Sequence, residues 1–157
     1  MTNKAKEIED EIRQRFIGDF REIVRGNSTP EEMAECVLKY VMDKSGLVNI
    51  DYQDVLTTLQ DMKEGDCVVV ETEKSNLQSA LKDCKTKLEN AHPDMNIEKL
   101  MLQIITPQQS GLIMDDMQMF YDFFNSIKED LEVSWGIAQR DDDSDKLILF
   151  IVAGFNH

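Results

Sequence analysis

The chain has 157 residues, of which 31 are Asp or Glu and 17 are Lys or Arg, so its formal net charge is -14. This charge repels nucleic acid and anionic membrane surfaces on average, and no apolar run reaches the roughly 18 residues of a transmembrane helix. The seven glycines are too widely spaced for a loop that cradles the phosphates of a nucleotide. We therefore expect a soluble cytoplasmic protein with no nucleic-acid partner, no membrane insertion and no cofactor.

The N-terminal stretch from Lys4 to Arg25 predicts an amphipathic helix. Its apolar residues recur mostly every four positions, which places them on one stripe: Ile8, Ile12, Phe16, Phe20 and Ile23. Such a stripe needs a partner surface. We interpret residues 1–28 as a helical extension of a domain that covers residues 29–157.

Two further helices are expected before the first strand. Thr29 to Glu32 has the residues of a capping box with proline in the first turn, so a helix begins there. Gly46 is a natural stop for this helix. The next helix is expected to begin near Asp51 and to end before Gly65.

Four segments predict strands: 67–70, 100–106, 131–138 and 146–153. Helices at 77–88, with Ser75 as N-cap, and at 117–127 separate the first three, which favours parallel pairing. The short link from Gln139 to Lys146 favours an antiparallel hairpin for the last two. The last segment is a near-continuous apolar run, typical of a strand buried on both faces. The expected fold is α+β with an α/β-like order, a mixed four-stranded sheet packed by helices, plus the N-terminal helix.

The cysteines do not indicate a disulfide framework or a zinc site. Cys36, Cys67 and Cys84 are odd in number and form no close pair in the sequence, and the two histidines do not supply the usual zinc-ligand spacing. We interpret all three cysteines as small buried hydrophobic residues.

The acidic run from Asp141 to Asp145 looks like part of a calcium loop. However, Lys146 stands where such a loop needs glycine, and Val152 stands where it needs a bidentate Glu. We predict a solvated turn and no metal site.

The string from Gly46 to Val55 has two interpretations. In the first, Asp51 caps a helix and Asp54 places a favourable negative charge in its first turn. In the second, Asp51 and Asp54 lie on one face and, with Asn49, could hold and polarise a water molecule. The residues alone leave both open.

This string resembles the co-catalytic loop of the tubulin/FtsZ family. There a long central helix ends at a glycine, followed by Asn, an aliphatic residue, Asp, an aromatic residue, a small residue, Asp and an aliphatic residue. Asn49, Asp51 and Asp54 match the Asn and the two Asp. Residues 29–45 then resemble the end of the central helix, and residues 46–55 the loop. The order of elements from Cys67 to Gly154 is similar to that of the family's C-terminal domain, and the glycine-rich GTP-binding half is absent.

In this family the loop of one subunit docks over GTP bound to the next, and its acidic residues orient the attacking water. The resemblance thus implies a protein that neither binds nor hydrolyses GTP alone, and that contacts an FtsZ-like filament of cell division or the cytoskeleton, or self-associates. A first alternative is part of a split GTPase that supplies the loop in trans. A second is a scaffolding module that keeps only the fold.

The resemblance also implies an exposed apolar surface. The central helix of the family is covered on one side by the nucleotide-binding domain, which is absent here. We expect the stripe from Ile8 to Phe20 to cover that surface, either within the chain or from a second copy.

Overall fold

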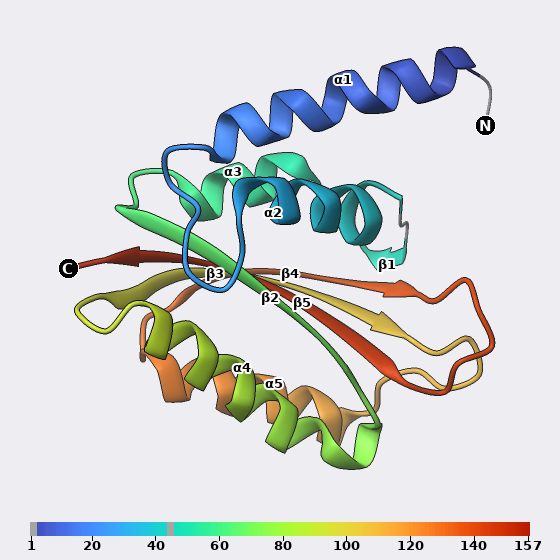
Figure 1. Cartoon of the computed structure of the whole chain (residues 1–157). Coiled ribbons are helices and arrows are strands. Elements are labelled where there is room, and N and C mark those ends of the chain that lie inside the picture. Colours follow the sequence, from blue (N-terminus) through green and yellow to red (C-terminus); the bar gives the residue numbers. More distant parts are fainter. Residues whose placement is uncertain (1–2, 44–45) are drawn as a thin grey trace.

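The computed structural model describes residues 3–43 and 46–157, which form helical layers on both faces of one sheet (Figure 1). The helices are α1 (Asn3–Phe20), α2 (Pro30–Val37), α3 (Tyr52–Leu59), α4 (Leu77–Ala91) and α5 (Met114–Ile127), with a π-helical turn η1 (Leu38–Met42) and a 3-10 turn η2 (Lys74–Asn76). The strands are β1 (Gly46–Val48), β2 (Glu64–Thr72), β3 (Asn96–Thr106), β4 (Glu132–Gln139) and β5 (Leu147–Asn156). Within the described ranges, no helix is long and apolar enough to cross a membrane.

The four predicted strands form a mixed sheet, and the short strand β1 extends it at one edge. The strand order is β1-β4-β3-β5-β2, in which β3 and β4 are parallel and every other neighbouring pair is antiparallel. Helices α2 and α3 cover one face, α1 lies over them, and α4 and α5 cover the other face (Figure 1). The predicted α+β fold is therefore confirmed.

The predicted hairpin between the last two strands is wrong, because β3 lies between β4 and β5. All residues of β5 except Ile148 and Asn156 are buried, and a strand so apolar is most stable with a neighbour on each side and helices over both faces. Reaching that position requires crossing one strand, or about 10 Å, which residues 140–146 span easily. Burial, not the length of the link, decides the pairing.

The N-terminal helix ends earlier than its periodicity predicts. It stops at Phe20, and Val24 instead forms a parallel bridge with Gly65 at the outer edge of β2. In α1 the residues Phe16, Ile17 and Phe20 are buried against α2 and α3. The chain thus covers its own apolar surface with the second half of α1.

The helix predicted for residues 29–45 begins as expected but changes form. Thr29 and Glu32 make the complete capping box, and α2 passes into η1 after Val37. The predicted end, at Lys44 and Ser45, lies outside the described residues. The prediction that Ser75 is the N-cap of the next helix is wrong, because Ser75 lies within η2 and α4 begins at Leu77.

Candidate functional site

The 46–55 loop places Asn49, Asp51 and Asp54 where strand β1 passes into helix α3. The Asp51 carboxylate accepts from the Asp54 backbone N–H at 3.1 Å, and the Asp54 carboxylate accepts from the Asp51 backbone N–H at 2.8 Å. The Asn49 side-chain oxygen accepts from the Gly46 backbone N–H at 2.8 Å. All three side chains therefore hold the loop in one conformation, and the helix-capping interpretation is confirmed.

The same three residues remain accessible to a partner. Asn49 and Asp51 are exposed and Asp54 is half-buried. Within residues 3–43 and 46–157, Oδ2 of Asp51 and Oδ1 of Asp54 accept no hydrogen bond from the chain. Each carboxylate thus uses one oxygen for its cap and keeps the other for water or for a donor on another protein. A catalytic role for these oxygens stays a prediction.

Tyr52 connects the loop to α1, a link that the sequence did not indicate. Its ring stacks on Phe16 with 3.9 Å between ring centroids, and its hydroxyl donates to the Asp19 carboxylate at 2.5 Å. Burial, followed by this hydrogen bond, raises the pKa of the Tyr52 phenol. The loop's frame therefore depends on α1 as well as on its own caps.

Next to the loop, Gly136 of strand β4 allows the backbone of strand β1 to approach closely. A Cβ at Gly136 would lie 2.6 Å from the Gln103 side-chain oxygen and 2.9 Å from the Val48 carbonyl oxygen. Gln103 is buried, its amide donates to the Tyr40 carbonyl at 3.0 Å, and its side-chain oxygen has no partner in the described part of the chain. Glycine in β4 thus lets the start of the loop lie directly on the sheet.

Replacing Gly46 by Ala should detach this end of the loop. The new Cβ would lie 2.0 Å from the Ile137 carbonyl oxygen, so β1 must move away from β4. We expect a loss of about 1–3 kcal/mol in the free energy of unfolding, measured by urea denaturation. Gly18→Ala is the control, because nothing lies within 4 Å of a Cβ there. Equal stability of the two variants would contradict the close approach.

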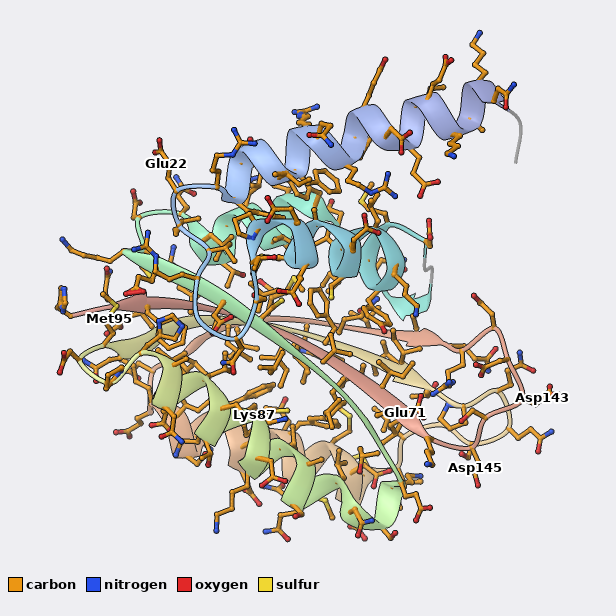
Figure 2. All side chains as sticks on the ribbon, viewed as in Figure 1. Glu22, Glu71, Lys87, Met95, Asp143 and Asp145 are labelled. Atoms are coloured by element: carbon orange, nitrogen blue, oxygen red, sulfur yellow. The ribbon has the colours of Figure 1, made fainter. Side chains whose placement is uncertain are left out.

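The acidic run is a solvated turn between β4 and β5, as predicted. Asp143 and Asp145 lie at the end of the sheet away from Met95 (Figure 2). Arg140 holds Asp142 with two hydrogen bonds, of 2.7 and 2.9 Å, and Glu71 with one of 3.0 Å. The bonds from Arg140 lower the pKa of Asp142 to about 2. Within the described ranges, no group of three His, Cys, Asp or Glu residues could hold a metal ion.

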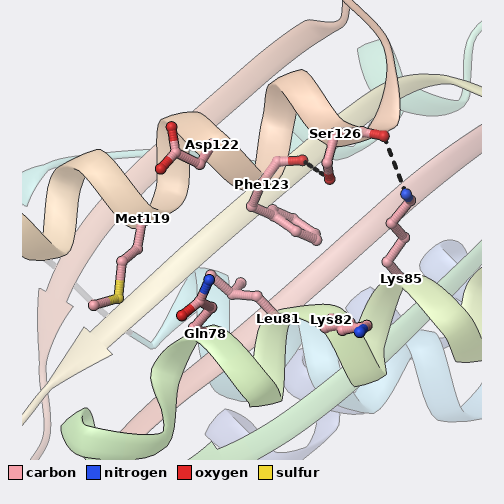
Figure 3. Close-up of a pocket in the computed structure, with 8 residues that line it drawn as sticks. All are labelled: Gln78, Leu81, Lys82, Lys85, Met119, Asp122, Phe123 and Ser126. Carbon is pink, nitrogen blue, oxygen red and sulfur yellow. Dashed lines mark hydrogen bonds between the residues drawn. The ribbon is translucent and has the colours of Figure 1, made fainter.

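A groove of about 440 Å³ separates α4 and α5 (Figure 3). Its lining mixes apolar and charged side chains, including Leu81, Phe123 and Lys82. Lys85 crosses between the helices and donates to the Ser126 carbonyl at 3.0 Å. Because α4 and α5 cover the other face of the sheet, this groove is separate from the 46–55 loop.

A buried polar cluster at the β2 edge was also missed by sequence reasoning. Asp66 is fully buried, and its carboxylate accepts hydrogen bonds from the backbone N–H groups of Asn27, Ser28 and Cys67. It also accepts hydrogen bonds from the side chains of Asn27 and Ser28 and lies 3.0 Å from a ring nitrogen of His92. The other ring nitrogen of His92 lies 3.3 Å from Glu64. Ser28 bonds Asp66 and the Cys67 N–H. In the described part of the chain the ring nitrogens of His92 bond carboxylates, and its ring stacks on Phe155. The cluster is therefore an anchor for the α1–α2 connection and not a nucleophile–base pair.

Comparison with known proteins supports the fold alone. No family model and no curated protein sequence matches the chain. Among solved structures, it is similar to the FtsZ W319Y mutant of M. jannaschii (TM-score 0.57, 15% identity, covering 80% of this chain and 38% of that one). It is also similar to the empty FtsZ dimer of M. jannaschii (TM-score 0.54, 15% identity, covering 79% of this chain and 37% of that one). A third similar structure is TubZ of Bacillus thuringiensis serovar israelensis in GDP-form protofilaments (TM-score 0.58, 11% identity, covering 80% of this chain and 36% of that one).

The chain therefore spans a little over a third of the length of these structures. The protein has an FtsZ/tubulin-like α+β fold, that of the FtsZ and TubZ C-terminal domain.

Proposed function

We propose that this protein acts by contact with other proteins, and that it presents its 46–55 loop to a filament of the FtsZ/TubZ type. The observation that carries the proposal is the loop itself: Asn49, Asp51 and Asp54 are accessible and held in place by the backbone. A preformed loop loses little conformational entropy on binding. The solved structures with this fold include a dimer and protofilaments, which supports a protein partner or self-association.

A second candidate function is a contribution to GTP hydrolysis in trans. It is favoured by the carboxylate oxygens of Asp51 and Asp54 that the caps leave unused. Carboxylates at this position can orient and polarise a water molecule on a partner's nucleotide. In both candidates the chain itself neither binds nor hydrolyses GTP.

The double variant Asp51→Asn, Asp54→Asn separates charge from folding. At the N-cap, Asn serves about as well as Asp, and an amide can replace the carboxylate at the third helical position of a capping box. The loop should therefore keep its shape while losing two negative charges. We expect wild-type protein to sediment with filaments of an FtsZ/TubZ-type protein, and the double variant to bind roughly tenfold more weakly, equivalent to about 1.4 kcal/mol. Phosphate release in the same mixture tests the second candidate, since only that candidate predicts faster GTP turnover that the variant abolishes.

Thr29→Ala is the matched control. It removes the other capping box, at the start of α2, and should cost about 1 kcal/mol of stability without reducing filament binding. Absence of cosedimentation by the wild type, or equal binding by the double variant, would refute the proposal.

A further inference from the structure

The α4–α5 groove has the spacing of a seat for a third helix. Its lining residues on α4 lie between Gln78 and Lys85, and those on α5 between Met119 and Ser126 (Figure 3). On each helix they recur at intervals of three and four residues, so each helix turns one face to the groove. Seven residues of helix rise about 10 Å. The groove can therefore take about two turns of a helix along its length.

The charges of the groove favour an acidic occupant. Lys82 is exposed, and its side chain makes no hydrogen bond or ion pair within the described ranges. The one carboxylate of the lining, that of Asp122, already accepts a hydrogen bond from Gln118 at 2.9 Å. In a chain whose net charge is -14, the groove thus presents an unused positive charge beside the apolar side chains of Leu81 and Phe123.

The first half of α1 carries the complementary residues. Its N-terminal turns extend past the ends of α2 and α3 (Figure 1), and half of the Ile8 surface is exposed. Glu7 and Glu11, four residues apart on one side of the helix, flank Ile8 and are exposed. Arg13 binds the two acidic residues between them. Neither Glu7 nor Glu11 has such a partner in the described part of the chain.

We propose that the first half of α1, residues 3–12, docks into the α4–α5 groove of a second copy of this chain. Ile8 then lies between Leu81 and Phe123 and loses its contact with water, which stabilises the contact. The carboxylates on either side of Ile8 face Lys82, so the charges of the two surfaces match.

The contact cannot be reciprocal within a simple pair. Helix α1 and the groove lie on opposite faces of the sheet (Figure 1). Each copy therefore offers α1 to one neighbour and its groove to another, which gives a head-to-tail series and not a symmetric dimer. The inference does not rest on the proposed function, because the groove is separate from the 46–55 loop.

Sedimentation velocity of the full chain at up to about 1 mM tests the association. We expect species larger than a dimer that grow with concentration. Lys82→Glu should weaken association roughly tenfold or more, because it places like charges opposite each other. Lys87→Glu is the matched control: it makes the same charge change on α4, at an exposed residue that does not line the groove, and it should associate as the wild type does.

Mixing two variants tests the direction of the contact. Glu11→Lys should also prevent association, although it makes the chain less negative. Lys82→Glu keeps an intact α1 and Glu11→Lys keeps an intact groove, so each should be monomeric alone and the mixture should associate. Both positions are exposed, and circular dichroism should show that both variants are folded.

Carbodiimide cross-linking of labelled with unlabelled copies identifies the paired residues. We expect an amide bond from Lys82 of one copy to Glu7 or Glu11 of the other. A chain that stays monomeric over the whole concentration range would leave the groove to a different protein and overturn the proposal. Equal weakening by Lys82→Glu and Lys87→Glu, or association of either variant alone at the wild-type level, would overturn it as well.

Discussion

Replacing Asp66 by Ala should destabilise the fold by about 3–5 kcal/mol, the cost of removing one partner from a buried charged network. The substitution leaves the N–H groups of Asn27 and Ser28 without their acceptor and His92 without its nearest carboxylate. It also removes the shorter of the two hydrogen bonds of the Cys67 N–H. Water cannot readily replace it, because Asp66 is fully buried. The α1–α2 connection would then lose its anchor on β2. Urea unfolding followed by circular dichroism measures the loss.

Asp83→Ala is the control for this prediction. Asp83 is exposed on α4, so its loss should change stability by no more than about 0.5 kcal/mol. Asp66→Asn should also be strongly destabilising, because its amide N–H₂ would face other donors. If Asp66→Ala unfolds within 1 kcal/mol or so of the wild type, the cluster is not the anchor that its geometry indicates.

Phe20→Ala should cost about 3–5 kcal/mol, the usual loss for a fully buried phenylalanine. Phe20 has no exposed surface, and its ring centroid lies 6.4 Å from that of Phe16 and 6.1 Å from that of Tyr52. The substitution would leave a cavity between α1 and the helices beneath it. Thermal unfolding should show the largest fall in Tm among single substitutions in α1.

Ile8→Ala tests the same helix at a large apolar residue that is exposed and not buried in the core. Half of the Ile8 surface is exposed, so we expect a loss below about 1 kcal/mol. Deleting residues 1–26 removes the whole cover and should cause aggregation, visible by light scattering. A truncated chain that stays soluble and equally stable would show that α1 is not a cover.

Local sequence patterns predicted the elements with a clear period. The strand of residues 147–156 and the α2 cap at Thr29 follow from apolar runs and capping residues close together in the sequence. Ser75 shows the limit of the same reasoning: it has the chemistry of a cap, but the chain makes a 3-10 turn there before α4 begins.

Long-range contacts could not be predicted from these patterns. Asp66 and His92 meet through packing of the α1–α2 connection, β2 and the end of α4, and no short motif records that meeting. The same holds for the place of β5 between β3 and β2. In the 46–55 loop, the sequence indicated that Asp51 and Asp54 lie on one face of a helix start. The structure shows that their carboxylates bond each other's backbone N–H groups and so fix the loop.

Hydrogen–deuterium exchange of this protein with and without an FtsZ/TubZ-type filament shows whether the 46–55 loop is the contact surface. We expect slower exchange of backbone amides in residues 46–56 when the filament is present, with no change in the α4–α5 groove around Lys82 and Phe123. Slower exchange only in the groove, or no difference anywhere in the chain, would contradict it.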